Sequence, residues 1–181
     1  MKNLSPAIFI VPLTALTLLV IGYFNLLKKV IKKAAFKRFV LITTVLAFVL
    51  NIVWEFVQMP LYRDAAFDAQ HIAFCLLASV ADAIMVLLLY FVFAIIYKQP
   101  FWIKYLNILR AFMLVVIGGI GAILAEMRHL SQGNWAYDSS MPILPFVNVG
   151  LSPLLQFMLL PVIIYYVSFY FLKKNDGSEM N

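Results

Sequence analysis

The stretch NIVWEFVQMPLY, residues 51–62, closes a hydrophobic run long enough to cross a membrane, and yet it contains a carboxylic acid, Glu55. A helix needs about 20 predominantly apolar residues to span the hydrocarbon core of a bilayer. Because backbone groups in lipid must be hydrogen-bonded within their own segment, continuous apolar runs of this length predict transmembrane helices. Five runs qualify, at residues 6–27, 38–60, 70–97, 107–127 and 150–172.

The composition predicts a polytopic membrane protein with a single all-α domain, residues 1–181. Of the 181 residues, 65% are hydrophobic and 12% are charged, and the mean hydropathy is +0.97. Soluble domains carry about 25% charged residues, so this chain has too few to cover a water-soluble globule. The single cysteine, Cys75, excludes an intramolecular disulfide and a cysteine-cluster metal site.

The basic residues predict the orientation of the helix bundle. Six of the fourteen lysines and arginines lie in the loop 28–38, and Lys98, Lys104, Arg110, Lys173 and Lys174 fall on the same side of the membrane. Only Lys2, Arg63 and Arg128 fall on the other side. Because cytoplasmic loops are enriched in lysine and arginine, we predict an outer N-terminus and a cytoplasmic C-terminus. The net charge of +6 is thus interpreted as a topology signal and not as a nucleic-acid site.

Polar or small side chains follow one face of each of three predicted helices, since residues three or four apart share a helix face. The three sets are Asn51, Glu55 and Gln58; His71, Cys75, Ser79 and Asp82; and Gly119, Ala122 and Glu126. Counted from Pro60 and Gln70, Glu55 lies roughly 8 Å and Asp82 roughly 18 Å below the outer surface. The spacing therefore predicts a polar cluster in the outer half of the bundle, with Asp82 at its base, above an apolar inner half.

Carboxyl groups inside a membrane are costly and are usually functional or paired with something functional. We therefore predict catalytic roles for Glu55, Asp82 and Glu126, with His71 as a proton relay. Asn51 and Gln58 are predicted to bind substrate, although hydrogen bonding between helices is an alternative role for both. Ion pairs of His71 and Arg128 with Glu55 and Glu126 are a structural alternative.

The connection 128–149 is long for a small helix bundle, and long loops in compact domains are often functional. Its aromatic residues make it too apolar to float free, and Pro142 and Pro145 preclude a regular helix. We predict a lid over the polar cluster, in which Trp135 and Tyr137 cover an apolar substrate or stabilise a developing cation. An interfacial loop anchored by its aromatic side chains is the alternative.

The segments WEFVQMPLY and WAYDSSMPILPFVNVGLSPLLQFMLLP resemble a family of small bacterial integral membrane proteins with no assigned activity, over about Asn51 to Pro161. The resemblance implies a multi-pass protein of the bacterial inner membrane and nothing about its chemistry. Gln156, which belongs to it, is included among the predicted substrate-binding residues. The residues that carry the resemblance are Trp54, Glu55, Gln58, Pro60, Leu61, Tyr62, Glu126, Trp135, Tyr137, Met141, Pro142, Pro145, Gly150, Leu151, Pro153, Leu154, Leu155 and Gln156.

No motif ties the chain to a named enzyme class, since it lacks H-E-x-x-H, a glycine-rich phosphate loop before a helix and G-x-S-x-G. We predict no cofactor, with a metal held by histidine and carboxylates as an alternative. The favoured function is a membrane-embedded enzyme doing acid–base chemistry on a lipid or isoprenoid-like substrate from the outer leaflet. One alternative is a non-catalytic subunit that binds a second copy or a partner protein through the face of Gly119 and Ala122. Another is a proton-coupled carrier component, which the apolar inner half disfavours.

Overall fold

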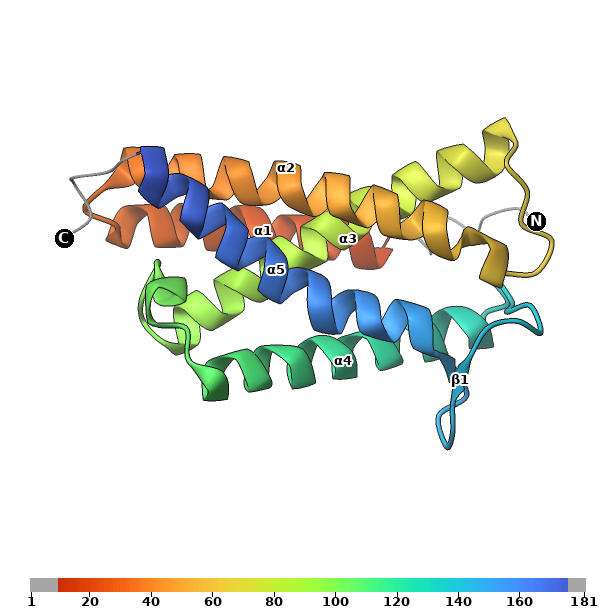
Figure 1. The fold of residues 1–181 in the computed structure, drawn as a ribbon. Helices are drawn as coiled ribbons and strands as arrows, with labels where there is room; N and C mark the ends of the chain where they lie inside the picture. The colour runs from red at the N-terminus through yellow and green to blue at the C-terminus, as the bar shows by residue number, and fades with distance from the viewer. Residues whose placement is uncertain (1–9, 176–181) are drawn as a thin grey trace.

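The computed structural model describes residues 10–175 and confirms the five predicted helices (Figure 1). All five are long and apolar enough to cross a membrane, as in a multi-pass membrane protein. The helices are α1 (Ile10–Lys29), α2 (Lys33–Gln58), α3 (Ala69–Ile96), α4 (Ile108–Ser131) and α5 (Leu151–Asn175), with 3-10 turns η2 (Met59–Leu61) and η3 (Trp102–Tyr105). Several helices extend beyond the predicted spans, because hydropathy detects only the apolar part of a helix whose ends are charged.

The first turns of two helices are fixed by the side chains that precede them. The Asp68 carboxylate accepts the backbone N–H groups of Gln70 and His71, each at 2.9 Å, at the start of α3. The Asn107 side chain accepts the backbone N–H of Arg110 at 2.9 Å at the start of α4. These N–H groups have no partner within the helix, so a capping side chain fixes where each helix begins.

The helices pack in the order α1, α3, α2, α5 and α4, so that sequence neighbours are not always spatial neighbours. α5 lies between α2 and α4, contacts both, and crosses the bundle from the end of α4 to the start of α2 (Figure 1). The loop 132–150 lies at one end of the bundle, which we call the loop end. The opposite end, where α1 and α5 finish, holds all eleven basic residues assigned to one side of the membrane, and we call it the basic end.

Small residues allow α4 and α5 to approach closely. Pro161 lies inside α5 and has no N–H, so the carbonyl of Phe157 receives no hydrogen bond from it within the helix. Gly118 of α4 lies directly against this carbonyl, with no room for a Cβ. A Cβ on Gly119 would contact Met158 at 3.2 Å and Leu154 at 3.4 Å. The close packing predicted for the small residues of α4 therefore takes place within the chain, and a partner protein on this helix stays a prediction.

Aromatic side chains fill the bundle toward the basic end. Five of them have no exposed surface, and we call them the aromatic cluster: Phe36, Phe39, Tyr90, Trp102 and Tyr165. Their polar atoms are hydrogen-bonded to the backbone. Trp102 Nε1 donates to the Tyr90 carbonyl at 3.2 Å, and the Tyr90 hydroxyl donates to the Pro100 carbonyl at 2.7 Å. The centre of this half of the protein is apolar, as the sequence predicts.

The loop 132–150 divides into two parts with different positions. Its first part is tied to the α2–α3 connection, since the Arg63 N–H donates to the Ala136 carbonyl and the Asp138 N–H to the Leu61 carbonyl, each at 2.9 Å. Its second part is a hairpin of β1 (Ile143–Leu144) and β2 (Val149–Gly150), which projects from the bundle (Figure 1). The loop is not helical, as its prolines predict, but only its first part lies where a lid would.

Candidate functional site

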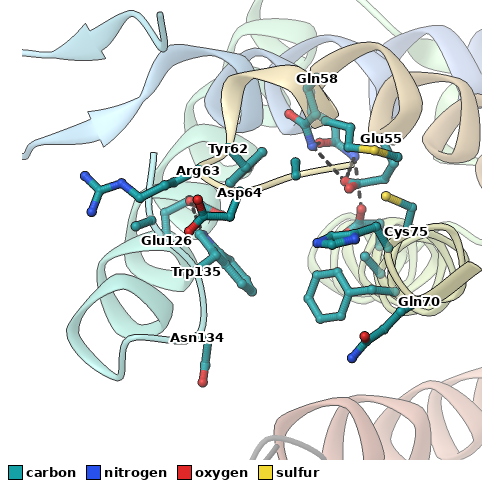
Figure 2. A pocket seen from close by; sticks show the side chains of 18 of the residues that line it. Glu55, Gln58, Tyr62, Arg63, Asp64, Gln70, Cys75, Glu126, Asn134 and Trp135 are labelled. Atoms are coloured by element: carbon teal, nitrogen blue, oxygen red, sulfur yellow. Dashed lines mark hydrogen bonds between the residues drawn. The ribbon is translucent and has the colours of Figure 1, made fainter. Parts of the chain in front are cut away.

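A polar cavity of about 530 Å³ opens at the loop end. Four helices that are distant in sequence supply its polar lining: Glu55 and Gln58 from α2, Asp82 from α3, Glu126 from α4 and Gln156 from α5. Figure 2 shows Glu55 on one side of the cavity and Glu126 on the other. The residues near its mouth include Arg63, Asp64, Gln70, His71 and Asn134.

The side-chain amide of Gln156 is the centre of the hydrogen-bond network beneath the cavity. Its Nε2 donates to Asn51 Oδ1 at 2.8 Å and to Asp82 Oδ2 at 3.0 Å, and lies 3.4 Å from Glu55 Oε1. Its Oε1 accepts from Gln58 Nε2 at 3.2 Å. Because a primary amide has two N–H groups, Glu55 at the longest distance is its weakest acceptor. One buried side chain thus joins α5 to both α2 and α3.

The carboxyl groups of Glu55 and Asp82 lie next to each other, because Gln156 Nε2 is 3.4 Å from Glu55 Oε1 and 3.0 Å from Asp82 Oδ2. Two carboxylates this close repel each other, which favours a proton on one of the two groups. Gln58 Nε2 donates to Glu55 Oε1 at 2.8 Å and fixes its orientation (Figure 2). Both carboxyl side chains are only partly buried. The pair therefore offers one proton donor and one proton acceptor to the cavity.

Glu126 is held on the opposite wall by two side chains of the loop. Its Oε2 accepts a hydrogen bond from Trp135 Nε1 at 3.1 Å and another from the Tyr137 hydroxyl. Burial and the hydrogen bond to Glu126 raise the pKa of the Tyr137 phenol, which therefore remains a donor at neutral pH. The Trp135 ring also stacks on His129, with centroids 4.3 Å apart. The first part of the loop is thus a wall of the cavity, as the lid prediction required.

His71 lies at the mouth of the cavity and pairs with Asp68, its Nδ1 being 2.9 Å from Asp68 Oδ2. His71 and Arg128 therefore do not form the ion pairs with Glu55 and Glu126 that the structural alternative predicts. Arg128 is exposed, and Glu126 is bound by the loop instead. Hydrogen bonds from the backbone and the ring of His71 lower the pKa of Asp68. A relay role for His71 stays a prediction.

The heights estimated along the helices are wrong for Asp82. They place its carboxyl group roughly 10 Å below that of Glu55, whereas both groups have an oxygen within 3.4 Å of the same atom, Gln156 Nε2. The reason is that α3 is inclined to α2 (Figure 1), so the distance along its axis overstates the depth of its residues.

Most of the predicted substrate-binding residues lie at the cavity, although not all of them face it. Gln58, Trp135 and Gln156 line it, while Tyr137 acts through Glu126. Asn51 is 1% exposed and lies beneath the lining, where its Nδ2 donates to the Ala47 carbonyl at 2.7 Å. This position corresponds to the alternative interpretation of Asn51 as a hydrogen-bonding residue between helices.

Ser152 belongs to the network and was not among the predicted residues. Its hydroxyl donates to Gln58 Oε1 at 2.9 Å and so completes the hydrogen bonds of that amide. Ser152 precedes Gln156 by four residues, which places both on the same face of α5. That spacing within LSPLLQ is the signal that could have identified it.

Comparisons of this chain with protein-family models, with curated proteins and with solved structures each gave no match. Within residues 10–175, no three His, Cys, Asp or Glu side chains are grouped in a way that could hold a metal ion. The function is therefore argued from the side chains of the polar cavity themselves.

Proposed function

We propose that this protein is a membrane-embedded enzyme that moves protons to and from a lipid or isoprenoid-like substrate. The adjacent carboxyl groups of Glu55 and Asp82, partly exposed in the polar cavity, carry the proposal. A carboxyl group in a membrane is costly and is typical of proton-handling or ligand-binding sites. Two such groups held together by Gln58 and Gln156 have the arrangement of an acid–base pair.

The pair supplies both halves of an acid–base reaction. The protonated carboxyl donates to one atom of the substrate, and the ionised carboxyl accepts a proton from another. A shift of a double bond has this form, since one proton is added and one is removed with no change in oxidation state. On the opposite wall, the face of Trp135 can stabilise the positive charge that develops when a double bond is protonated.

The charge distribution supports an outer-leaflet location for the reaction. Cytoplasmic loops are enriched in lysine and arginine, which supports a cytoplasmic basic end and an outer loop end with its cavity. The resemblance carried by WEFVQMPLY supports the bacterial inner membrane. The aromatic cluster fills the bundle between the cavity and the basic end, which disfavours the alternative of a carrier.

A non-catalytic subunit is the second candidate, and the hairpin favours it. Phe146 at its tip is fully exposed, and Ile143 in β1 is 44% exposed. Apolar side chains gathered on an exposed surface are typical of interaction sites. This candidate predicts a protein that co-purifies with the chain and dissociates when Phe146 is replaced by serine.

The test compares wild type with Glu55→Gln and with the control Asp64→Asn. Asp64 is an exposed carboxyl at the cavity mouth with φ of 60°, a conformation that asparagine tolerates. Native mass spectrometry of each protein in mild detergent identifies a small bound lipid, and turnover of that lipid is then measured in liposomes.

We expect Glu55→Gln to lose about 100-fold or more in turnover with its helical content unchanged, because glutamine keeps the shape but cannot exchange the proton. Asp64→Asn should keep full turnover. Full activity of Glu55→Gln would overturn the proposal. Bulk phospholipid alone in every preparation, together with a co-purifying protein, would favour the subunit.

A further inference from the structure

A second cavity, of about 400 Å³, extends from the polar cavity along the bundle between α3 and α4, and we call it the apolar groove. Four residues line both spaces: Asp82, Glu126, Trp135 and Phe157. The polar cavity and the apolar groove therefore meet at the carboxyl groups. Most of the remaining groove lining is apolar and includes Met85, Leu88, Val92, Ile117, Gly121 and Ala125.

The helix order explains why this groove exists. α1 and α3 are at one side of the packed row and α4 is at the other, with α5 between α4 and α2. Phe157 of α5 lines the space between α3 and α4. The side of α4 that borders it carries small residues, and a Cβ on Gly121 would meet no other atom within 4 Å. Both bordering helices are long and apolar enough to span a membrane, so we expect lipid hydrocarbon chains beside the groove.

We propose that the apolar groove binds the hydrocarbon chain of a lipid alcohol and brings its hydroxyl head to the carboxyl groups of the polar cavity. This proposal rests on the proposed function and specifies its substrate class. The groove extends over Ala81 to Val92 on α3, roughly 16 Å, and over Ile117 to His129 on α4, roughly 18 Å. One leaflet of a 30 Å hydrocarbon core is about 15 Å deep. The groove therefore has the length of one chain from one leaflet.

The polar cavity determines the kind of head group. Four carboxyl residues line it, Glu55, Asp64, Asp82 and Glu126, so an anionic head would be repelled. Figure 2 shows the Arg63 side chain directed away from Glu55, so the carboxyl pair has no guanidinium beside it. A hydroxyl is uncharged, and it both donates and accepts hydrogen bonds, as the pair of Glu55 and Asp82 requires.

The test fills the groove without touching the polar cavity. Gly121→Leu puts a side chain into open space in the groove. The control, Leu124→Phe, adds bulk at a 63% exposed residue of α4 that does not line the groove. The probes are hexadecan-1-ol and hexadecanoate, titrated against each protein in detergent and counted by native mass spectrometry.

We expect wild type and Leu124→Phe to bind one hexadecan-1-ol with equal Kd, and Gly121→Leu to bind it at least about tenfold more weakly, since even one methylene in an apolar pocket has an effect of that size. Hexadecanoate should bind more weakly than the alcohol to wild type. Equal binding by Gly121→Leu and wild type, or no binding by wild type, would overturn the proposal. Hexadecanoate binding as tightly as the alcohol would overturn the choice of head group.

These experiments distinguish failure of the groove proposal from failure of the acid–base proposal. Glu55→Gln keeps the groove, so it should still bind hexadecan-1-ol. If it also kept full turnover, the acid–base function would fail while the groove result stood. If Gly121→Leu bound the alcohol normally while Glu55→Gln lost turnover, the groove proposal would fail alone.

Discussion

Replacing Gln156 with leucine should lower the free energy of unfolding by about 2 kcal/mol. The amide makes three hydrogen bonds of 3.2 Å or less, with Asn51, Asp82 and Gln58, and each of them joins α5 to another helix. Hydrogen bonds between membrane helices contribute about 0.6 kcal/mol on average, so three give about 2 kcal/mol. Leucine has nearly the same volume as glutamine, which keeps the packing term small.

The assay is reversible unfolding in mixed micelles, in which SDS is titrated and helicity is followed by circular dichroism. Gln99→Leu is the matched control, because Gln99 is exposed in the α3–α4 connection and the substitution is chemically the same. Surface substitutions of this kind change stability by no more than about 0.5 kcal/mol.

A double-mutant cycle makes the test specific for the network. Asn51→Leu removes one partner of Gln156, so the double variant should be less destabilised than the sum of the two single variants. If Gln156→Leu unfolded within about 0.5 kcal/mol of wild type, or if the two substitutions were strictly additive, Gln156 would not join the helices as described.

Two further predictions concern the packing of α4 and the start of α3. Gly118→Ala should destabilise the protein by about 1–3 kcal/mol, because its Cβ would meet the Phe157 carbonyl. Gly121→Ala should instead stabilise it by about 0.5–1 kcal/mol. Equal effects of the two substitutions in the same unfolding assay would contradict the close packing of α4 on α5. Asp68 has a lowered pKa in the folded protein, so its ionised form stabilises the fold at pH values above its pKa in the unfolded chain, near 3.9. This stabilisation is lost as the pH falls through the pKa of Asp68 in the folded protein. Thermal melts of wild type and Asp68→Ala should therefore differ at about pH 6 and converge toward about pH 2, and a difference independent of pH would refute the role of the Asp68 carboxylate.

The helices and their polar faces could be predicted because both depend on local sequence. Hydropathy located all five helices, and the spacing of Glu55 and Gln58 placed them on one face, where the structure has them. The arrangement of the helices could not be predicted in this way, since hydropathy contains no information on which helix packs on which. The closeness of Glu55 and Asp82 depends on the inclination of α3, and the apolar groove depends on the packing order.

Gln156 illustrates the same limit within one residue. Its sequence context showed only a glutamine in an apolar segment, and its inclusion rested on a resemblance. Its importance comes from the position of α5 between α2 and α4, which turns one amide into the junction of three helices. The hairpin at 143–150 was missed for a related reason, because Pro142 and Pro145 exclude a helix without specifying what replaces it.

The aromatic cluster has a consequence for the source of the protons. Phe36, Phe39, Tyr90, Trp102 and Tyr165 occupy the bundle between the carboxyl pair and the basic end, and none of them has exposed surface. Water can reach Glu55 and Asp82 from the mouth at the loop end, where the cavity opens. We therefore expect the two carboxyl groups to equilibrate with the aqueous phase on the side of the loop end. Acidifying that compartment should change their protonation, while the same change in the other compartment should leave it unaltered.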